Sequence, residues 1–146
     1  MTGAGEDVQI RLAETDAEIA ACFAVMHELR PMLAASEFVE RVRRQMSEGY
    51  RLARLDAEGA VATVAGFRVN EKLHGGRTMY VDDLVTAAAA RSCGHGHAML
   101  GWLIARARAE GCTNFALDSG THRTEAHAFY LRERLRITSF HFQLPL

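Results

Sequence analysis

The first fifty residues show a pattern of apolar and polar positions that predicts one strand followed by two helices. Residues 8–12 alternate with the two-residue period of a half-buried strand. From Asp16 onward, apolar side chains recur at helical spacing until Pro31, whose ring disfavours helix at the residue before it. Ser36 can cap the second helix, and Gly49 is placed to end it in a left-handed conformation.

The remaining pattern predicts a meander of three strands and then a helix, a strand, a second helix and a final strand. The expected elements are strands at 50–55, 60–69 and 78–85, a helix at 94–110, a strand at 114–117, a helix from Thr124 through Tyr130, and a strand at 138–144. A strand–helix–strand crossover implies parallel pairing of the strand at 114–117. The order β-α-α-β-β-β-α-β-α-β favours an α+β fold, in which helices flank a mixed, mostly antiparallel sheet.

Composition narrows the class of protein without naming a function. The 146 residues fit one domain, 1–146, and the net charge of -1 gives no overall attraction to nucleic acid. No apolar run approaches the ~20 residues of a membrane span, and the first residues lack the features of a signal peptide. The three widely spaced cysteines build no disulfide framework and favour a reducing, cytoplasmic location.

The segment between the third meander strand and the following helix is the best candidate for a binding site. Its glycines let backbone N–H groups converge, and a helix start adds unpaired donors and the positive end of the helix dipole. An isolated pair of glycines more often only turns the chain. The dinucleotide fingerprint is excluded, because its third glycine would fall on Met99. The phosphate-binding candidates are Arg91, Ser92, Cys93, Gly94, His95, Gly96, His97 and Ala98.

Three motifs in this chain resemble those of the GNAT superfamily of acyl-CoA N-acyltransferases. Residues 91–96, Arg-Ser-Cys-Gly-His-Gly, match the family signature [Q/R]-x-x-G-x-[G/A]. Residues 80–86 look like the fourth strand of the family, and residues 126–130 are similar to its A-x-x-F-Y motif. The chain departs from the family pattern at Arg123, at Arg134-Leu135 and at His97. The resemblance spans nearly the whole chain.

The resemblance implies an N-acetyltransferase that uses acetyl-CoA as co-substrate, with no metal, and transfers the acetyl group directly. It implies that the backbone N–H groups near Leu84 and Val85 hold the acetyl carbonyl, as an oxyanion hole does. It also implies that Tyr130 is the general acid for the leaving thiolate, although periodicity alone favours a core tyrosine. The sequence Asp82-Asp83-Leu84 resembles that of small-amine acetyltransferases of the family, and this resemblance favours a small-molecule amine as acceptor. A protein amino group, or a sensor that binds acyl-CoA without turnover, remains an alternative, and a homodimer is compatible with the family.

Two acidic residues and several histidines are further candidates for the site. Asp82 and Asp83 should alternate across their strand, so that one faces the acceptor, and Asp82 is the preferred catalytic carboxylate. Cys93, His95 and His97 do not have a familiar zinc spacing. The side chains of His122, Arg123 and His127 could line the acceptor pocket or lie on the surface.

Overall fold

The computed structural model describes residues 7–146, which divide into two compact units, one ending at Ala116 and one spanning Leu117–Leu146. The elements are β1 (Gln9–Leu12), α1 (Asp16–Ala20), α2 (Phe23–Leu29), α3 (Ala35–Met46), β2 (Arg51–Ala57), β3 (Ala60–Lys72), β4 (Gly76–Thr86), the 3-10 turn η1 (Ala88–Ala90), α4 (His95–Ala109), β5 (Asn114–Leu117) and α5 (Thr124–Arg132). Single-domain organisation of residues 1–146 stays a prediction.

The sheet has five strands in the order β1-β2-β3-β4-β5, and β1 to β4 pair antiparallel as the meander predicts. The Thr113 N–H donates to the Arg77 carbonyl at 2.8 Å, and Asn114 Nδ2 contacts Thr78 Oγ1 at 3.5 Å. Residue numbers therefore rise together along the two strands, so β5 runs parallel to β4. The α+β fold class expected from the sequence is confirmed.

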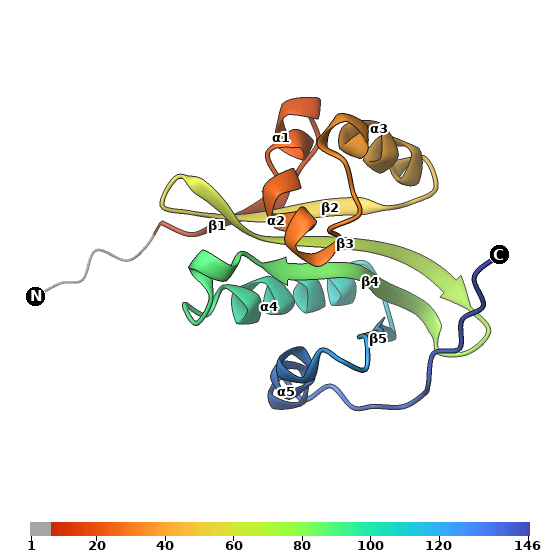
Figure 1. The fold of residues 1–146 in the computed structure, drawn as a ribbon. Coiled ribbons are helices and arrows are strands. Elements are labelled where there is room, and N and C mark those ends of the chain that lie inside the picture. Colours follow the sequence, from red (N-terminus) through yellow and green to blue (C-terminus); the bar gives the residue numbers. More distant parts are fainter. Residues whose placement is uncertain (1–6) are drawn as a thin grey trace, which may run out of the picture. The chain divides into compact units, whose positions relative to one another are not determined.

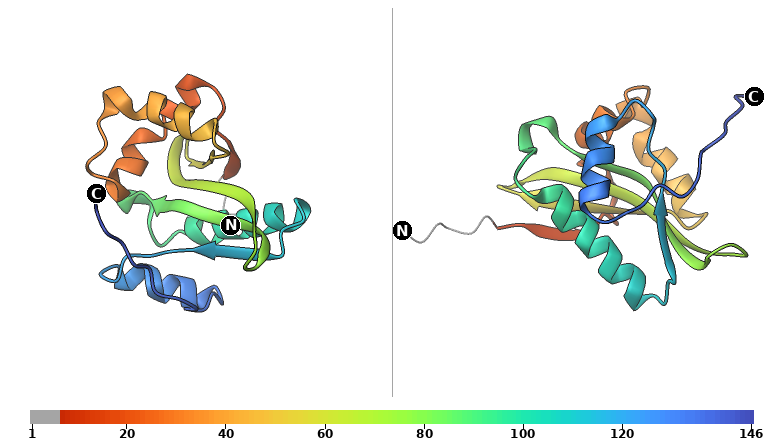
Figure 2. Two further views of the ribbon diagram at one scale, coloured as in Figure 1. Left: turned by 90° about the vertical axis from the view of Figure 1, so that its right-hand side faces the viewer. Right: turned by 90° about the horizontal axis from the view of Figure 1, so that it is seen from below.

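Helices α1, α2 and α3 cover one face of the sheet, and α4 covers the other (Figures 1 and 2). The buried residues between the sheet and the first three helices are Ala13, Ile19, Cys22, Val25, Met26, Phe38, Val42, Tyr50, Leu52, Val64 and Val85. On the other side, α4 buries Met99, Leu100, Leu103 and Ala107. The sheet is thus covered on both faces around β3 and β4.

The first helical segment is interrupted, where the sequence predicts one continuous helix up to Arg30. A capping box between Thr15 and Glu18 starts α1, and the chain turns at residues 21–22 before α2 begins. The Cys22 N–H bonds to the Ile19 carbonyl at 3.0 Å, as in a 3-10 turn. The Glu18 carbonyl, its expected α-helical partner, instead accepts from Cys22 Sγ and Arg54 Nη1, each at 3.4 Å.

The prediction of a final strand at residues 138–144 is wrong, because in the described chain this segment belongs to no strand. Phe140, Phe142 and Leu144 do alternate with the period of a strand, yet they are 83%, 90% and 79% exposed. Alternation describes which residues would share a face, but a strand forms only when its backbone pairs with a neighbour. No helix of the described residues is long and apolar enough to cross a membrane.

Candidate functional site

The start of α4 offers backbone donors that the helix itself does not use. The first α-helical bond runs from the Ala98 N–H to the Gly94 carbonyl at 3.0 Å. Helix geometry leaves the N–H groups of His95 and Gly96 without an intrahelical partner. Gly94, the N-cap, lies in the left-handed region with φ 79°, and no side chain caps the helix there. These donors and the positive end of the helix dipole form an anion-binding arrangement.

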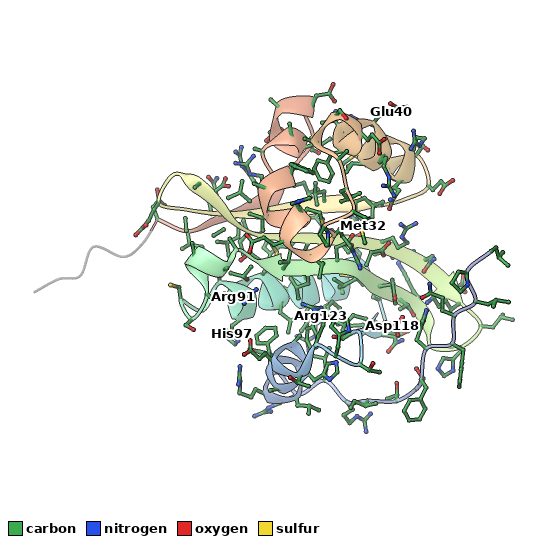
Figure 3. All side chains as sticks on the ribbon, in the orientation of Figure 1. Met32, Glu40, Arg91, His97, Asp118 and Arg123 are labelled. Carbon is green, nitrogen blue, oxygen red and sulfur yellow. The ribbon has the colours of Figure 1, made fainter. Side chains whose placement is uncertain are left out.

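The loop before α4 keeps its polar side chains toward solvent. Arg91, Ser92 and Cys93 are exposed, and Ser92 also has a positive φ of 65°. Figure 3 shows Arg91 and His97 near the start of α4. The His95 side chain is only 4% exposed, so this residue faces the anion site through its backbone N–H and not through its ring. The first turn of α4 contains no acidic residue that would repel an anion.

The residues of β4 expected to hold the acetyl group lie in the last part of that strand. Leu84 and Val85 pair with Ala65 and Val64 of β3. The other neighbour of β4 in the sheet is β5, which begins beside Thr78 at the opposite end of β4.

A β-bulge places both acidic residues of β4 on one face of the sheet. Gly66 pairs with Asp83, but the next residue of β3, Phe67, pairs with Val81, so Asp82 is an extra residue in β4. Because of this extra residue, the side chains of Asp82 and Asp83 point to the same face instead of opposite faces. The expected strict alternation is therefore wrong, and both carboxylates lie on the side of α1 to α3.

Asp83 is held by one tyrosine and one arginine. The Tyr50 hydroxyl donates to Asp83 Oδ2 at 2.8 Å, and Arg30 Nε donates to Asp83 Oδ1 at 3.0 Å. Arg30 Nη2 also donates to the backbone carbonyl of Asp82 at 3.0 Å. Burial, followed by the charge of Asp83, raises the pKa of Tyr50 well above its ordinary value. The Tyr50 hydroxyl therefore stays protonated and donates at neutral pH.

Asp82 has a separate cationic partner. Arg68 Nη2 donates to Asp82 Oδ2 at 2.8 Å, and its Nε reaches both carboxylate oxygens at 3.1 and 3.2 Å. The same guanidinium donates to Gln45 Oε1 at 3.3 Å and lies 5.5 Å from the centre of the Tyr50 ring. The hydrogen bond to Asp82 is the largest cause that raises the pKa of Arg68. Asp82 and Asp83 thus belong to one cluster connected through Tyr50.

Tyr130, the expected general acid, belongs to α5 of the second unit. Its ring lies 5.5 Å from that of Phe129, and burial raises the pKa of its phenol while Arg123 acts in the opposite direction. His127 forms a 2.7 Å hydrogen bond between its Nε2 and the carbonyl oxygen of Gly120. Arg123 and His127 are therefore both engaged inside this unit. The catalytic role of Tyr130 stays a prediction.

Sequence reasoning missed Arg30, Tyr50 and Arg68, because their partners on β4 are 14 to 53 residues away in the chain. One signal was available: Gly66 inside a strand pattern is typical of a bulge or a close approach. A Cβ on Gly66 would overlap the Tyr50 hydroxyl. Among residues 7–146, no group of three or more His, Cys, Asp or Glu side chains could hold a metal ion.

The sequence of residues 13–134 matches the model of the acetyltransferase (GNAT) family. A curated relative, the uncharacterized N-acetyltransferase YhdJ of Bacillus subtilis (strain 168), is 31% identical over 131 residues. That alignment covers 88% of this chain and 92% of the relative. Both comparisons extend over most of the chain, including β4, the loop before α4 and most of α5.

Solved acetyltransferases share the fold at low sequence identity. An aminoglycoside N-acetyltransferase in complex with CoA is similar with a TM-score of 0.85 and 11% identity, covering 100% of this chain and 99% of that one. Glucosamine-6-phosphate N-acetyltransferase from Arabidopsis thaliana is similar with a TM-score of 0.75 and 19% identity, covering 96% and 99%. These likenesses concern the fold.

Proposed function

Because this chain belongs to the GNAT family of acetyltransferases and is an acetyl-CoA-dependent N-acetyltransferase, we propose that it passes the acetyl group directly to a primary amine of a small molecule. The observation that carries the acetyl-CoA part of this proposal is the start of α4, where backbone donors and the helix dipole suit the pyrophosphate of CoA. Arg91 is exposed beside these donors and can add forked hydrogen bonds to phosphate oxygens.

In the proposed reaction, the neutral amine nitrogen attacks the thioester carbonyl carbon, the N–C bond forms and the C–S bond breaks. The backbone N–H groups of Leu84 and Val85 stabilise the oxyanion that develops during attack. The amine nitrogen loses a proton to water, and Tyr130 donates its phenolic proton to the departing thiolate and recovers one from solvent. The Tyr130 phenol, whose pKa burial raises, is protonated at neutral pH and so has a proton to give, as a phenol of ordinary pKa also has.

A panel assay tests the proposed activity by measuring thiol release from acetyl-CoA in the presence of diverse small amines and of lysine-containing peptides. We expect turnover with a small amine and intersecting lines in double-reciprocal plots, as direct transfer in a ternary complex requires. Parallel lines would indicate an acetylated enzyme. Turnover with peptides alone would make a protein amino group the acceptor, and CoA binding without any turnover would indicate a sensor.

The assignment of the phosphate site is tested separately by thermal denaturation with excess CoA. A ligand that binds only the native state raises its stability, so we expect a higher Tm. Gly96→Val should remove this shift, because a branched side chain would stand where pyrophosphate meets the backbone donors. Gly101→Ala, a change further along α4, is the control and should keep the shift, since a Cβ there meets nothing within 4 Å. A retained shift in Gly96→Val would contradict the assignment.

We also propose that the protein is a cytoplasmic homodimer. The free cysteines Cys22, Cys93 and Cys112 support the location. The exposed alternating side chains of Phe140 and Phe142 support self-association, because aromatic side chains of this size are usually buried against a partner. Sedimentation equilibrium of the full chain should give twice the mass of 16.1 kDa, and a monomer at every concentration would contradict the proposal.

A further inference from the structure

The guanidinium of Arg30 occupies a position on β4 that has the chemistry of an ammonium-binding site. Two oxygen acceptors face it, the Oδ1 atom of Asp83 and the backbone carbonyl of Asp82, each at 3.0 Å. Both belong to the bulge of β4 that directly precedes Leu84. A primary ammonium group has three donors and one positive charge, so it can replace both hydrogen bonds of Arg30 and its charge.

Arg30 is the more easily displaced of the two arginines in this cluster. Its side chain is 45% exposed and contacts the carboxylate through one nitrogen, whereas Arg68 is 25% exposed and contacts both oxygens of Asp82. Arg30 is also the C-cap of α2 and precedes Pro31, so no helical turn follows it directly. Solvent reaches the Arg30 side of this ion pair, although Asp83 is only 15% exposed, and this screening together with the cost of ordering the arginine side chain weakens the contact.

The carboxylate of Asp83 keeps its orientation toward a cation when Arg30 leaves. The Tyr50 hydroxyl still donates to the other carboxylate oxygen, which fixes the orientation of the carboxylate and leaves Oδ1 directed at its cationic partner. Tyr50 is itself only 4% exposed and lies against Gly66, so its position does not depend on Arg30. Asp82 would offer no such oxygen to a cation, because Arg68 remains bound to both of its carboxylate oxygens.

We propose that Arg30 is a built-in competitor of the acceptor, and that a cationic primary amine binds by displacing its guanidinium from Asp83 and the Asp82 carbonyl. This inference rests on the proposed function, since it places the acceptor beside the acetyl group expected at Leu84 and Val85. It makes Asp83 the residue that recognises the acceptor and Tyr50 the positioning residue that orients it. The substrate class is then an amine that carries its charge at neutral pH, binds as the ammonium, and loses one proton to water before its neutral nitrogen attacks the thioester.

Steady-state kinetics of Arg30→Ala test the competition. Removal of the internal cation should lower the KM of the amine by about fivefold, the factor that corresponds to about 1 kcal/mol, with the KM of acetyl-CoA unchanged. Added methylguanidinium should then compete with the amine in the variant and have little effect on the wild type, because it refills the site that Arg30 occupied. If Arg30→Ala does not fold, Arg30→Gln keeps the length of the side chain without its charge.

Arg43→Ala is a matched control with the same type of contacts at a different place. Arg43 is also 45% exposed, and it also bridges a carboxylate and a backbone carbonyl, those of Asp16 and Glu14, at 2.9 and 2.8 Å. This variant should keep the wild-type KM of the amine. The variant Asp83→Asn should raise that KM by about tenfold or more, because the amine loses a hydrogen bond to a charged group, while the KM of acetyl-CoA is retained.

The inference and the proposed function fail in different ways. Absence of turnover by the wild type with every amine would remove the proposed function. With an active wild type, an unchanged or raised amine KM in Arg30→Ala, or inhibition by methylguanidinium that is not competitive with the amine, would overturn the role of Arg30 alone. An amine KM in Asp83→Asn equal to that of the wild type would likewise overturn it.

Discussion

Replacement of Gly66 by alanine tests whether the close approach of Tyr50 to β3 holds the carboxylate cluster together. Gly66 lies opposite Asp83 at the bulge, and a Cβ there would overlap the Tyr50 hydroxyl and the ring carbons next to it. The obstructing atoms belong to a ring that is 4% exposed, so the ring cannot simply turn toward solvent. The Tyr50 side chain must move, and its 2.8 Å hydrogen bond to Asp83 is lost.

The expected loss of stability has two parts. Forcing an extra methyl into a packed core costs about 1–3 kcal/mol, and a lost hydrogen bond to a charged group costs about 1.5–3 kcal/mol. Because one displacement of the ring causes both effects, we expect Gly66→Ala to lower the free energy of unfolding by about 3 kcal/mol. That is a large share of the about 5–15 kcal/mol that stabilises an ordinary domain.

Urea unfolding followed by circular dichroism measures this loss, with Gly101→Ala as the matched control. Gly101 lies within α4 and a Cβ there meets nothing within 4 Å, so the same change should stabilise by about 0.5–1 kcal/mol. In a Tyr50→Leu background, which removes the hydroxyl, Gly66→Ala should cost at least 1 kcal/mol less than in the wild type. A loss below about 0.5 kcal/mol, or equal losses in both backgrounds, would refute the reasoning.

Two further predictions concern the tyrosines. Tyr130→Phe should lower kcat by about 100- to 10,000-fold and leave CoA affinity intact, because a general acid acts only as the C–S bond breaks. Steady-state rates, measured alongside a titration of CoA binding, check this. A fall in kcat of no more than about threefold would exclude the role. The pKa of Tyr50 is raised in the folded state, so its contribution to stability is present below about pH 10 and is lost as the pH rises toward the folded pKa. Denaturation between pH 9 and 11.5 should therefore show a steeper alkaline loss for the wild type than for Tyr50→Phe, by up to about 1.4 kcal/mol per pH unit, and parallel profiles would contradict it.

Periodicity predicted most of the elements because each depends on which face of a segment is buried. The meander, α3, α4 and β5 all follow their apolar patterns, and Gly49 follows α3 with φ 98°, the left-handed conformation expected there. The break between α1 and α2 did not follow from spacing. At the break, the Glu18 carbonyl accepts from Arg54, a residue of β2 that lies 36 positions away and that helical spacing does not reveal.

The site was predicted only as far as its chemistry is local. The loop before α4 is a contiguous segment, so its glycines and its position before a helix could be interpreted directly from sequence. The face on which Asp83 lies depends on a register shift with β3, and its partners Tyr50 and Arg30 are 33 and 53 residues away. A one-residue change of register moves a side chain to the other face, and the pattern of β4 alone does not contain that information.

The bulge of β4 links the fold to the proposed chemistry. Without the bulge, Asp82 would pair with Gly66 and Asp83 would face α4, so the two carboxylates would lie on opposite faces of the sheet. With it, the Asp83 carboxylate lies on the same face as Arg30, one residue before the backbone expected to hold the acetyl carbonyl. Gly66 permits this arrangement, because only a residue without a Cβ leaves room for the Tyr50 ring against β3. Gly66 in the partner strand therefore controls the position of Tyr50 and, through it, the orientation of the Asp83 carboxylate to which the proposal assigns the acceptor.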